Sequence, residues 1–225
     1  SAAFYFDMTD DMDMENSGLN WSGYVNYIDS WGTEPLNVFA NKVKLQSLGI
    51  KESEIKNKVS LMGNARSNFL GIQSQLWTET AANTYEFDRM LMPNMIIFSE
   101  RAWGKKEEWL KEKSVSNQKP LLKKSWNRFA NTVGQRQLPF LSKLNKDLLF
   151  DLPKPGAIIE NGILKIRQQF PGLEIRYTTD GKKPSKTDIL FTKPVEVKSS
   201  DKIVVRLFDL NGRGGNSIKL INGNN

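Results

Sequence analysis

The chain divides at Leu152-Pro153-Lys154-Pro155-Gly156, a cluster of residues that interrupt helices and strands. Before this cluster, apolar residues recur mainly at helical spacing. After it, short alternating stretches are separated by turn signals. The cluster is therefore predicted to be a short linker between residues 1–150 and residues 151–225. A chain of 225 residues is long enough for two ordinary domains.

The second part is predicted to be β throughout. Asn161-Gly162 and Asp180-Gly181 are strong signals for tight turns, and Asn211-Gly212 and Gly214-Gly215 add two more. The expected strands are 157–160, 163–168, 173–178, 189–192, 194–198, 202–208 and 217–221. About seven short strands in a stretch of this length are typical of a small immunoglobulin-like sandwich.

Three helices are expected in the first part. One covers residues 35–48, and a second starts near Asn83, which has a capping-box partner three residues on. Pro93 should kink the second helix because it lacks a backbone donor. The third covers residues 120–134, with Gly134 as its C-terminal stop. Its apolar residues recur at steps of four, three and four: Leu122, Trp126, Phe129 and Val133.

Two short strands are also expected in the first part, at Phe4-Tyr5-Phe6 and, buried, at residues 69–77. Strands that alternate with helices indicate βα units of a parallel sheet or barrel. Two strands are too few for either, because a parallel sheet buries both faces and needs neighbours on each edge. We infer that residues 1–150 are the end of a larger domain.

The composition excludes several kinds of chemistry for this chain alone. There are no cysteines and no histidines, so it offers no disulfide, Cys or His zinc site, thiol nucleophile or Ser-His-Asp triad. The net charge is +7, but the lysines are spread among acids, which favours a solvated surface over nucleic-acid binding. No apolar run approaches the roughly 20 residues of a membrane-spanning helix, and the first residues lack a signal-peptide pattern.

Polar and aromatic side chains alternate where the two predicted strands end. Tyr5 and Asp7 share one side of the first strand, and Trp77 and Glu79 share one side of the second. In a barrel, such positions reach the active-site mouth. An aromatic ring beside a carboxylate suits a sugar, whose C–H face stacks on the ring while its hydroxyls donate to the carboxylate. Core packing of the aromatic residues, and turn or helix capping by the acids, remain open alternatives.

An acidic loop lies between these strands and contains Asp10-Asp11-Met12-Asp13 and Glu15. It lacks the central Gly and terminal Glu of a calcium loop. Adjacent loop acids also do not provide the two separated carboxylates of a glycosidase, so a solvated loop is favoured. Trp21, which follows the loop, is either a second sugar platform or an anchor of the loop to the core.

These segments resemble the C-terminal part of bacterial β-N-acetylhexosaminidases of glycoside hydrolase family 20, which includes chitobiase. Tyr5-Phe6-Asp7-Met8 resembles the Tyr-Leu-Asp-Met segment of the seventh barrel strand, and residues 18–25 resemble the Trp-Ala-Gly-Tyr/Phe-Val loop. Residues 70–80 are similar to the eighth strand, which ends in Trp-Thr/Ser-Glu, and residues 90–103 are similar to the closing helix. Further likeness lies at 134–139, 155–157 and 177–181.

The resemblance implies an α/β plus all-β fold. Residues 1–150 would be the C-terminal portion of the catalytic (β/α)8 TIM barrel, about strands 7 and 8 with closing helices. Residues 151–225 would be the chitobiase-type C-terminal β-sandwich domain, which is immunoglobulin-like.

The resemblance also implies a glycosidase that removes non-reducing terminal N-acetyl-hexosamine by a retaining mechanism, in which the substrate's own acetamide oxygen is the nucleophile. Tyr5 would hold that oxygen, and Trp21 and Trp77 would wall the pocket. Glu79 would bind the 4-hydroxyl of the sugar, and Asp7 its 6-hydroxyl side. No cofactor and no metal are implied.

The chain departs from the family in lacking the His-x-Gly-Gly-Asp-Glu motif with the acid/base Glu, and the sugar-binding Arg of the first strand. The isolated chain is therefore predicted to be inactive. The expected partners are N-acetylglucosamine- or N-acetylgalactosamine-terminated glycans of the chitooligosaccharide kind and the missing N-terminal barrel portion, with self-association through the truncated sheet edge as a further option. The family implies a periplasmic, secreted or envelope-associated location.

A non-catalytic carbohydrate-binding or interaction module is the alternative. It predicts aromatic residues along one face of residues 157–221, a stretch that contains no tryptophan.

Overall fold

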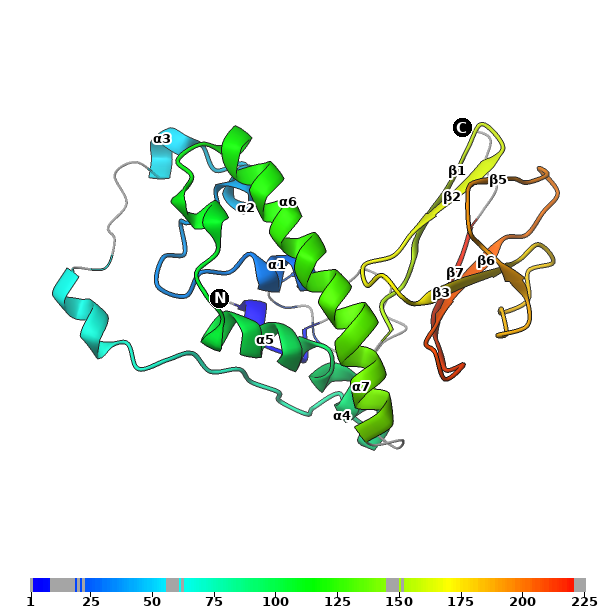
Figure 1. The fold of residues 1–225 in the computed structure, drawn as a ribbon, viewed down its shortest axis with the longest axis horizontal. Coiled ribbons are helices and arrows are strands. Elements are labelled where there is room, and N and C mark those ends of the chain that lie inside the picture. Colours follow the sequence, from blue (N-terminus) through cyan, green and yellow to red (C-terminus); the bar gives the residue numbers. More distant parts are fainter. Residues whose placement is uncertain are drawn as a thin grey trace. The chain divides into compact units, whose positions relative to one another are not determined.

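The computed structural model describes residues 2–8, 19, 21, 23–55, 61, 63–144, 150 and 152–220 (Figure 1). The chain forms two compact units, Ser1–Arg128 and Phe129–Asn225, and each is described by itself. These two units meet after Arg128, whereas the domain boundary predicted from the sequence lies between residues 150 and 151. The predicted boundary separates two domains of the family and stays a prediction. In the described part of the chain, no helix is long and apolar enough to cross a membrane.

The first unit is helical. Its longer helices are α4 (Thr84–Leu91), α5 (Asn94–Trp103) and α6 (Val115–Thr132), the last of which continues into the second unit. Shorter elements are the 3-10 turns Ala2–Phe4, Gly63–Asn68 and Glu108–Lys111 and the helices α1 (Tyr27–Trp31), α2 (Lys42–Ser47) and α3 (Glu52–Ile55). The helices α1 and α5 lie against each other, as Figure 1 shows.

The first predicted helix is shorter than expected. It begins only at Lys42, because the side chain of Asn41 accepts a hydrogen bond from the Lys44 amide at 3.0 Å and so caps the helix there. The preceding residues form turns instead, with the Ala40 amide donating to the Asn37 carbonyl at 2.9 Å. Asparagine favours caps and turns over helix interiors, and this preference overrides the start signal of Pro35.

The second predicted helix starts where expected but does not continue past Pro93. The Asn83 side chain accepts from the Glu86 amide at 3.0 Å, and the Glu86 carboxylate accepts from the Ala82 amide at 2.7 Å. The helix α4 ends at Leu91 and α5 begins at Asn94. Proline therefore separates two helices here and does not merely kink one.

The third predicted helix is confirmed in its buried stripe, but its expected stop is wrong. All four stripe residues are buried: Leu122, Trp126, Phe129 and Val133. The chain continues past Gly134 as a π-helical turn, Val133–Gln137, and then as α7 (Leu138–Leu144). A Cβ at Gly134 would overlap the carbonyl oxygen of Pro171. Close backbone packing, rather than helix termination, thus accounts for this glycine.

The two strands predicted in the first part are present only as a short parallel contact in the described residues. The Phe6 amide donates to the Gln75 carbonyl at 2.9 Å, and the Gln75 amide donates to the Phe4 carbonyl at 3.1 Å. Phe4 and Phe6 are buried, but Leu70 is 99% exposed, so the expected burial of the second strand is wrong at its start. One pair of parallel segments offers no neighbouring strands to cover both faces.

The second unit contains two small antiparallel sheets (Figure 1). One has the order β1-β2-β5 and the other the order β4-β3-β6-β7. The strands are β1 (Gly156–Glu160), β2 (Ile163–Arg167), β3 (Glu174–Thr178), β4 (Ile189–Leu190), β5 (Val195–Glu196), β6 (Val204–Phe208) and β7 (Gly214–Lys219). Each overlaps a strand expected from the sequence, and the end of the last prediction, residue 221, lies outside the described residues.

Three of the four predicted turns are confirmed by the backbone. Asn161 and Gly162 have φ of 52° and 74°, and Gly181 and Gly212 also have positive φ. The turn predicted at Gly214-Gly215 is wrong, because these residues begin β7. A Cβ on Gly214 would overlap the guanidinium of Arg206, so the glycine makes room for that side chain.

The predicted linker is part of the second unit's packing. Leu152 is 2% exposed, and Pro153 and Pro155 are buried. A Cβ on Gly215 of β7 would lie 2.7 Å from the Leu152 side chain, so the junction packs directly on this strand.

Candidate functional site

The contact between residues 4–6 and Gln75 brings the candidate site residues of two distant segments to the same end of the pair. Asp7 follows the first segment directly, and Trp77 and Glu79 follow the second. Beyond Asp7, the Leu19 amide donates to the Asp7 carbonyl at 2.7 Å. Parallel segments place their carboxyl ends together. The pairing of Tyr5 with Gln75 therefore brings the residues that follow each segment to the same end.

Asp7 is the most unusual residue of the site. It is 1% exposed, and within the described chain neither oxygen of its carboxylate has a hydrogen-bond partner. Burial raises the pKa of Asp7, and the negative charge of Glu79 raises it further. The backbone amides of Asp7 and Trp77 are near enough to oppose this rise in pKa, although they do not reach hydrogen-bond geometry.

The indole rings of the two predicted site tryptophans are accessible. Trp21 is 65% exposed and Trp77 is 55% exposed, so neither is a core residue of the described structure. The ring of Tyr5 meets that of Trp21 edge-on, with centroids 5.7 Å apart and planes at 87°. Exposed aromatic faces are suited to an amphipathic ring such as a sugar.

Glu79 lies exposed at a tight backbone turn, where its amide donates to the Trp77 carbonyl. The cap of the following helix is Asn83, so Glu79 does not serve as that cap. Among the five predicted site residues, the ring of Tyr5 contacts the ring of Trp21, and Asp7 is near enough to Glu79 and to the Trp77 backbone for each to affect its pKa. The acidic loop, residues 9–18, lies outside the described residues.

Contacts that the sequence did not predict support the segment that carries Tyr5 and Asp7. The Ser30 hydroxyl of α1 donates to the Ala3 carbonyl at 2.8 Å. The ring of Phe98 on α5 packs edge-on against Phe4 at 5.4 Å and Phe6 at 6.2 Å. The helical period identifies Phe98 as a core position, but no local signal marks Ser30, because its partner lies far away in the sequence.

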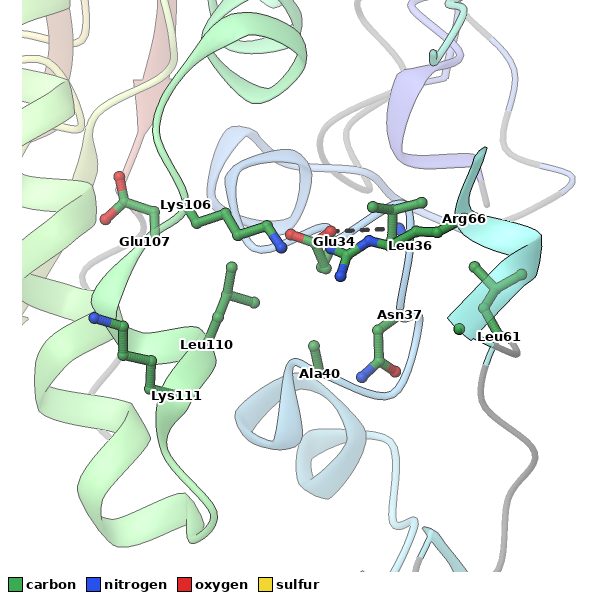
Figure 2. Close-up of a pocket in the computed structure, with 11 residues that line it drawn as sticks. Glu34, Leu36, Asn37, Ala40, Leu61, Arg66, Lys106, Glu107, Leu110 and Lys111 are labelled. Atoms are coloured by element: carbon green, nitrogen blue, oxygen red, sulfur yellow. Dashed lines mark hydrogen bonds between the residues drawn. The ribbon is translucent and has the colours of Figure 1, made fainter. Parts of the chain in front are cut away.

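A separate cavity of about 410 Å³ lies elsewhere in the first unit and contains none of the five site residues (Figure 2). Its acids are already engaged. Glu34 accepts from the Leu36 amide at 3.3 Å and from Arg101 at 3.4 Å, and Glu107 accepts from Arg128 at 3.0 Å. We therefore place the candidate site at Asp7 and Glu79. Within the described residues, no group of three or more His, Cys, Asp or Glu side chains is arranged to hold a metal ion.

Both parts of the chain are similar to known protein families. Residues 1–106, which contain all five site residues, match the glycosyl hydrolase family 20 catalytic domain, and residues 140–217 match the chitobiase/beta-hexosaminidase C-terminal domain. The chain belongs to the glycosyl hydrolase family 20 hexosaminidases and carries part of the catalytic domain together with the C-terminal domain.

Two relatives are each 30% identical to the chain. A beta-hexosaminidase of Vibrio vulnificus matches 97% of this chain and 27% of its own length, and an N,N'-diacetylchitobiase of Vibrio harveyi matches 79% of this chain and 20% of its own length. The chain thus spans about a quarter of the length of these relatives or less.

Proposed function

We propose that this chain is the C-terminal part of an exo-acting β-N-acetylhexosaminidase and forms one side of the pocket for a terminal N-acetyl-hexosamine. The observation that carries the proposal is the buried Asp7 carboxylate, which lies beside Glu79 and has no hydrogen-bond partner in the described chain. A buried polar group without a partner is costly, and a sugar hydroxyl is a donor of suitable kind. Family membership and the names of both relatives support the same function.

In this proposal, residues 1–150 supply about strands 7 and 8 of a (β/α)8 barrel with its closing helices. The parallel contact of Tyr5 with Gln75, each at the start of a segment that leads into the site, supports this assignment. Residues 151–225 supply the immunoglobulin-like sandwich, which the two antiparallel sheets support. The exposed Leu70 and the neighbouring Phe69 would be covered by the missing barrel portion or, in the chain alone, by a second copy.

The proposed reaction is a retaining, substrate-assisted hydrolysis. Tyr5 donates to the acetamide oxygen of the substrate and holds it for attack on the anomeric carbon, which makes the first step intramolecular. Trp21 and Trp77 stack on the sugar and its acetamide, Glu79 accepts from the 4-hydroxyl, and Asp7 binds the 6-hydroxyl side. The leaving-group oxygen takes its proton from an acid outside this chain, so we expect no turnover by the chain alone.

The alternative of a binding module in the second unit receives less support. Phe170, Tyr177 and Phe208 are buried, and Phe191 is half-buried. Residues 157–220 therefore present no exposed aromatic platform for a sugar. We further propose, on family resemblance alone, that the complete protein works in the periplasm, outside the cell or at the envelope.

The proposal is tested by the coding sequence upstream of Ser1 and by activity. We expect upstream strand-helix units with a His-x-Gly-Gly-Asp-Glu segment, and hydrolysis of 4-nitrophenyl N-acetyl-β-glucosaminide by the longer polypeptide. Glu79→Gln in that polypeptide should lower kcat/KM by about 100-fold, the loss expected from a charge-assisted hydrogen bond made to the reacting sugar. An unrelated upstream domain, or comparable turnover by the isolated chain, contradicts the proposal.

A further inference from the structure

The cavity of about 410 Å³ in the first unit combines apolar walls with charged side chains (Figure 2). Leu36, Ala40 and Leu110 line it and are half-buried. Ligand cavities are commonly of this size, with mainly apolar walls and a few polar groups that fix the orientation of the ligand. The cavity is therefore large enough for a small organic molecule, and its charged residues decide which kind.

Most charges around the cavity are already neutralised in pairs. Three ion pairs account for both acids of the lining and for one of its lysines: Glu34 with Arg101 at 3.4 Å, Glu107 with Arg128 at 3.0 Å, and Lys111 with Glu108 at 2.7 Å. The other two cations of the lining are Arg66 and Lys106, and neither forms an ion pair with any residue that the structure describes. The cavity thus carries an excess of positive charge.

The two unpaired cations come from opposite sides of the cavity. Arg66 belongs to the 3-10 turn Gly63–Asn68, and Lys106 lies between α5 and the turn Glu108–Lys111. Figure 2 shows their side chains extending toward each other. Both residues are exposed, so a ligand can reach them from solvent. A guanidinium binds phosphate or carboxylate oxygens through two parallel N–H donors, and an amine adds a compact charge.

We propose that this cavity is a second ligand site and takes a phosphate monoester with a small apolar body. The phosphate, which is close to a dianion at neutral pH, matches the two unpaired cations, and the apolar body lies against Leu36 and Leu110. The cavity contains none of the five candidate site residues. Arg66 precedes the segment 69–77, whereas Trp77 lies at its end. The inference is therefore independent of the proposed function.

The test is an NMR titration of the 225-residue chain with three ligands that share an alkyl body: n-butyl phosphate, pentanoate and 1-pentanol. Binding is followed at the backbone amides of Asn37 and Leu110, which line the cavity. At neutral pH and low salt, we expect the affinity to fall about tenfold at each step, from dianion to monoanion to neutral alcohol. Added salt should weaken phosphate binding most, because both cations are exposed.

Neutralising variants identify the source of the preference. Arg66→Gln and Lys106→Gln change exposed residues, so the fold should persist, and each should lower the affinity for n-butyl phosphate about tenfold. Lys111→Gln is the matched control, because it removes the same charge from the same lining but at a lysine that pairs with Glu108. We expect this variant to change the affinity less than about twofold.

The contrary outcomes are distinct. If pentanoate or 1-pentanol binds as tightly as n-butyl phosphate, or if no ligand shifts the cavity amides at millimolar concentration, the proposal is overturned. If Lys111→Gln weakens binding as much as Lys106→Gln, net charge is responsible and the assignment to the unpaired cations is overturned. N-acetylglucosamine should not displace n-butyl phosphate, and displacement would overturn the second site. The sugar site itself is judged by the indole signals of Trp21 and Trp77, whichever way this test falls.

Discussion

The second unit supplies its own backbone partners, whereas the candidate site in the first unit is held by isolated contacts. Strand β1 pairs with β2, and β3 with β6, in continuous antiparallel registers. Among the residues that the structure describes, the strand-like pairing of the site segments in the first unit consists of single bridges, Tyr5 with Gln75 and Met8 with Leu19. The pairing of β1 with β2 therefore joins segments that are adjacent in the chain, while the bridge between Tyr5 and Gln75 joins segments that are far apart in it.

Two polar side chains, the half-buried Arg206 and the buried Asp7, show the same difference. In the second unit, the Arg206 guanidinium donates to the carbonyls of Pro184, Gly214 and Gly215 at 2.7–3.1 Å. In the first unit, the carboxylate of Asp7 has no such partner among the described residues. The donors that would complete Asp7 are expected from a ligand or from further polypeptide, as the proposed function requires.

The largest expected effect tests the independence of the β unit. Phe170 is fully buried, and Phe170→Ala should lower the free energy of unfolding of the second unit by about 3–5 kcal/mol, because it leaves a cavity. Hydrogen exchange of the β3 and β6 amides measures this loss. All six tryptophans lie in the first unit, so tryptophan fluorescence reports the first unit separately.

The control for this change is Leu210→Ala, at a position that is 65% exposed, where we expect a loss below about 0.5 kcal/mol. An equal loss of stability in both units on Phe170→Ala would show that they do not unfold separately.

The next effect concerns the close packing of the π-helical turn. Gly134→Ala introduces a Cβ that would overlap the Pro171 carbonyl, and should cost about 1–3 kcal/mol of second-unit stability through strain. Gly156→Ala is the matched change in the same unit, since its Cβ would come no closer than 4.0 Å to the Arg167 carbonyl oxygen. Equal exchange rates in the two variants would refute the packing explanation of Gly134.

A smaller effect, of opposite sign, is expected at the site. Asp7→Asn removes a buried carboxylate without partners and should stabilise the first unit at neutral pH by about 1 kcal/mol. The pKa of Asp7 is raised in the folded state, so the charged form is the destabilising one. The stabilisation by Asn should therefore vanish below pH 3.8, the usual value, and grow as pH rises through the raised pKa.

Urea unfolding followed by tryptophan fluorescence, at several pH values, measures this difference. A variant that is less stable than the unchanged chain throughout the pH range would mean that Asp7 has structural partners after all.

The smallest effect is expected at the surface. Glu108 and Lys111 form an exposed pair at 2.7 Å, and Glu108→Gln should change first-unit stability by less than about 0.5 kcal/mol. If Glu108→Gln lowers the free energy of unfolding of the first unit by several times that amount in the same urea experiment, this exposed ion pair stabilises the unit more than we expect.

The sequence predicted the β unit well because its signals are local. Asn161-Gly162 favours a tight turn in which both residues have positive φ. The apolar residues that alternate on either side of this turn then form the paired strands β1 and β2. The prediction of a turn at Gly214-Gly215 was wrong because glycine occurs both in turns and where a neighbouring side chain needs space. Here it makes space for Arg206, a residue of the neighbouring strand that no local pattern reveals.

The first unit was predicted less well because its determinants are distant. The spacing of apolar residues and the capping signals predicted the start of α4 and the buried face of α6. The sequence did not predict that Asn41 caps α2 and so delays its start. It also did not predict that Gly134 packs against the Pro171 backbone instead of ending a helix. The site residues were identified by alternation at predicted strand ends and by family resemblance. The sequence did not predict that the Asp7 carboxylate is buried without a hydrogen-bond partner in the described chain. That property depends on the three-dimensional surroundings of Asp7, which the spacing of residues does not reveal.

The central claim is that Trp21 and Trp77 border a sugar pocket with Asp7 and Glu79. The most direct measurement is an NMR titration of the isotope-labelled chain with N-acetylglucosamine, observing the six indole N–H signals. We expect shifts at Trp21 and Trp77, which are exposed, and none at Trp31 and Trp109, which are buried. Shifts confined to the β unit, or none at Trp21 and Trp77, would contradict the account.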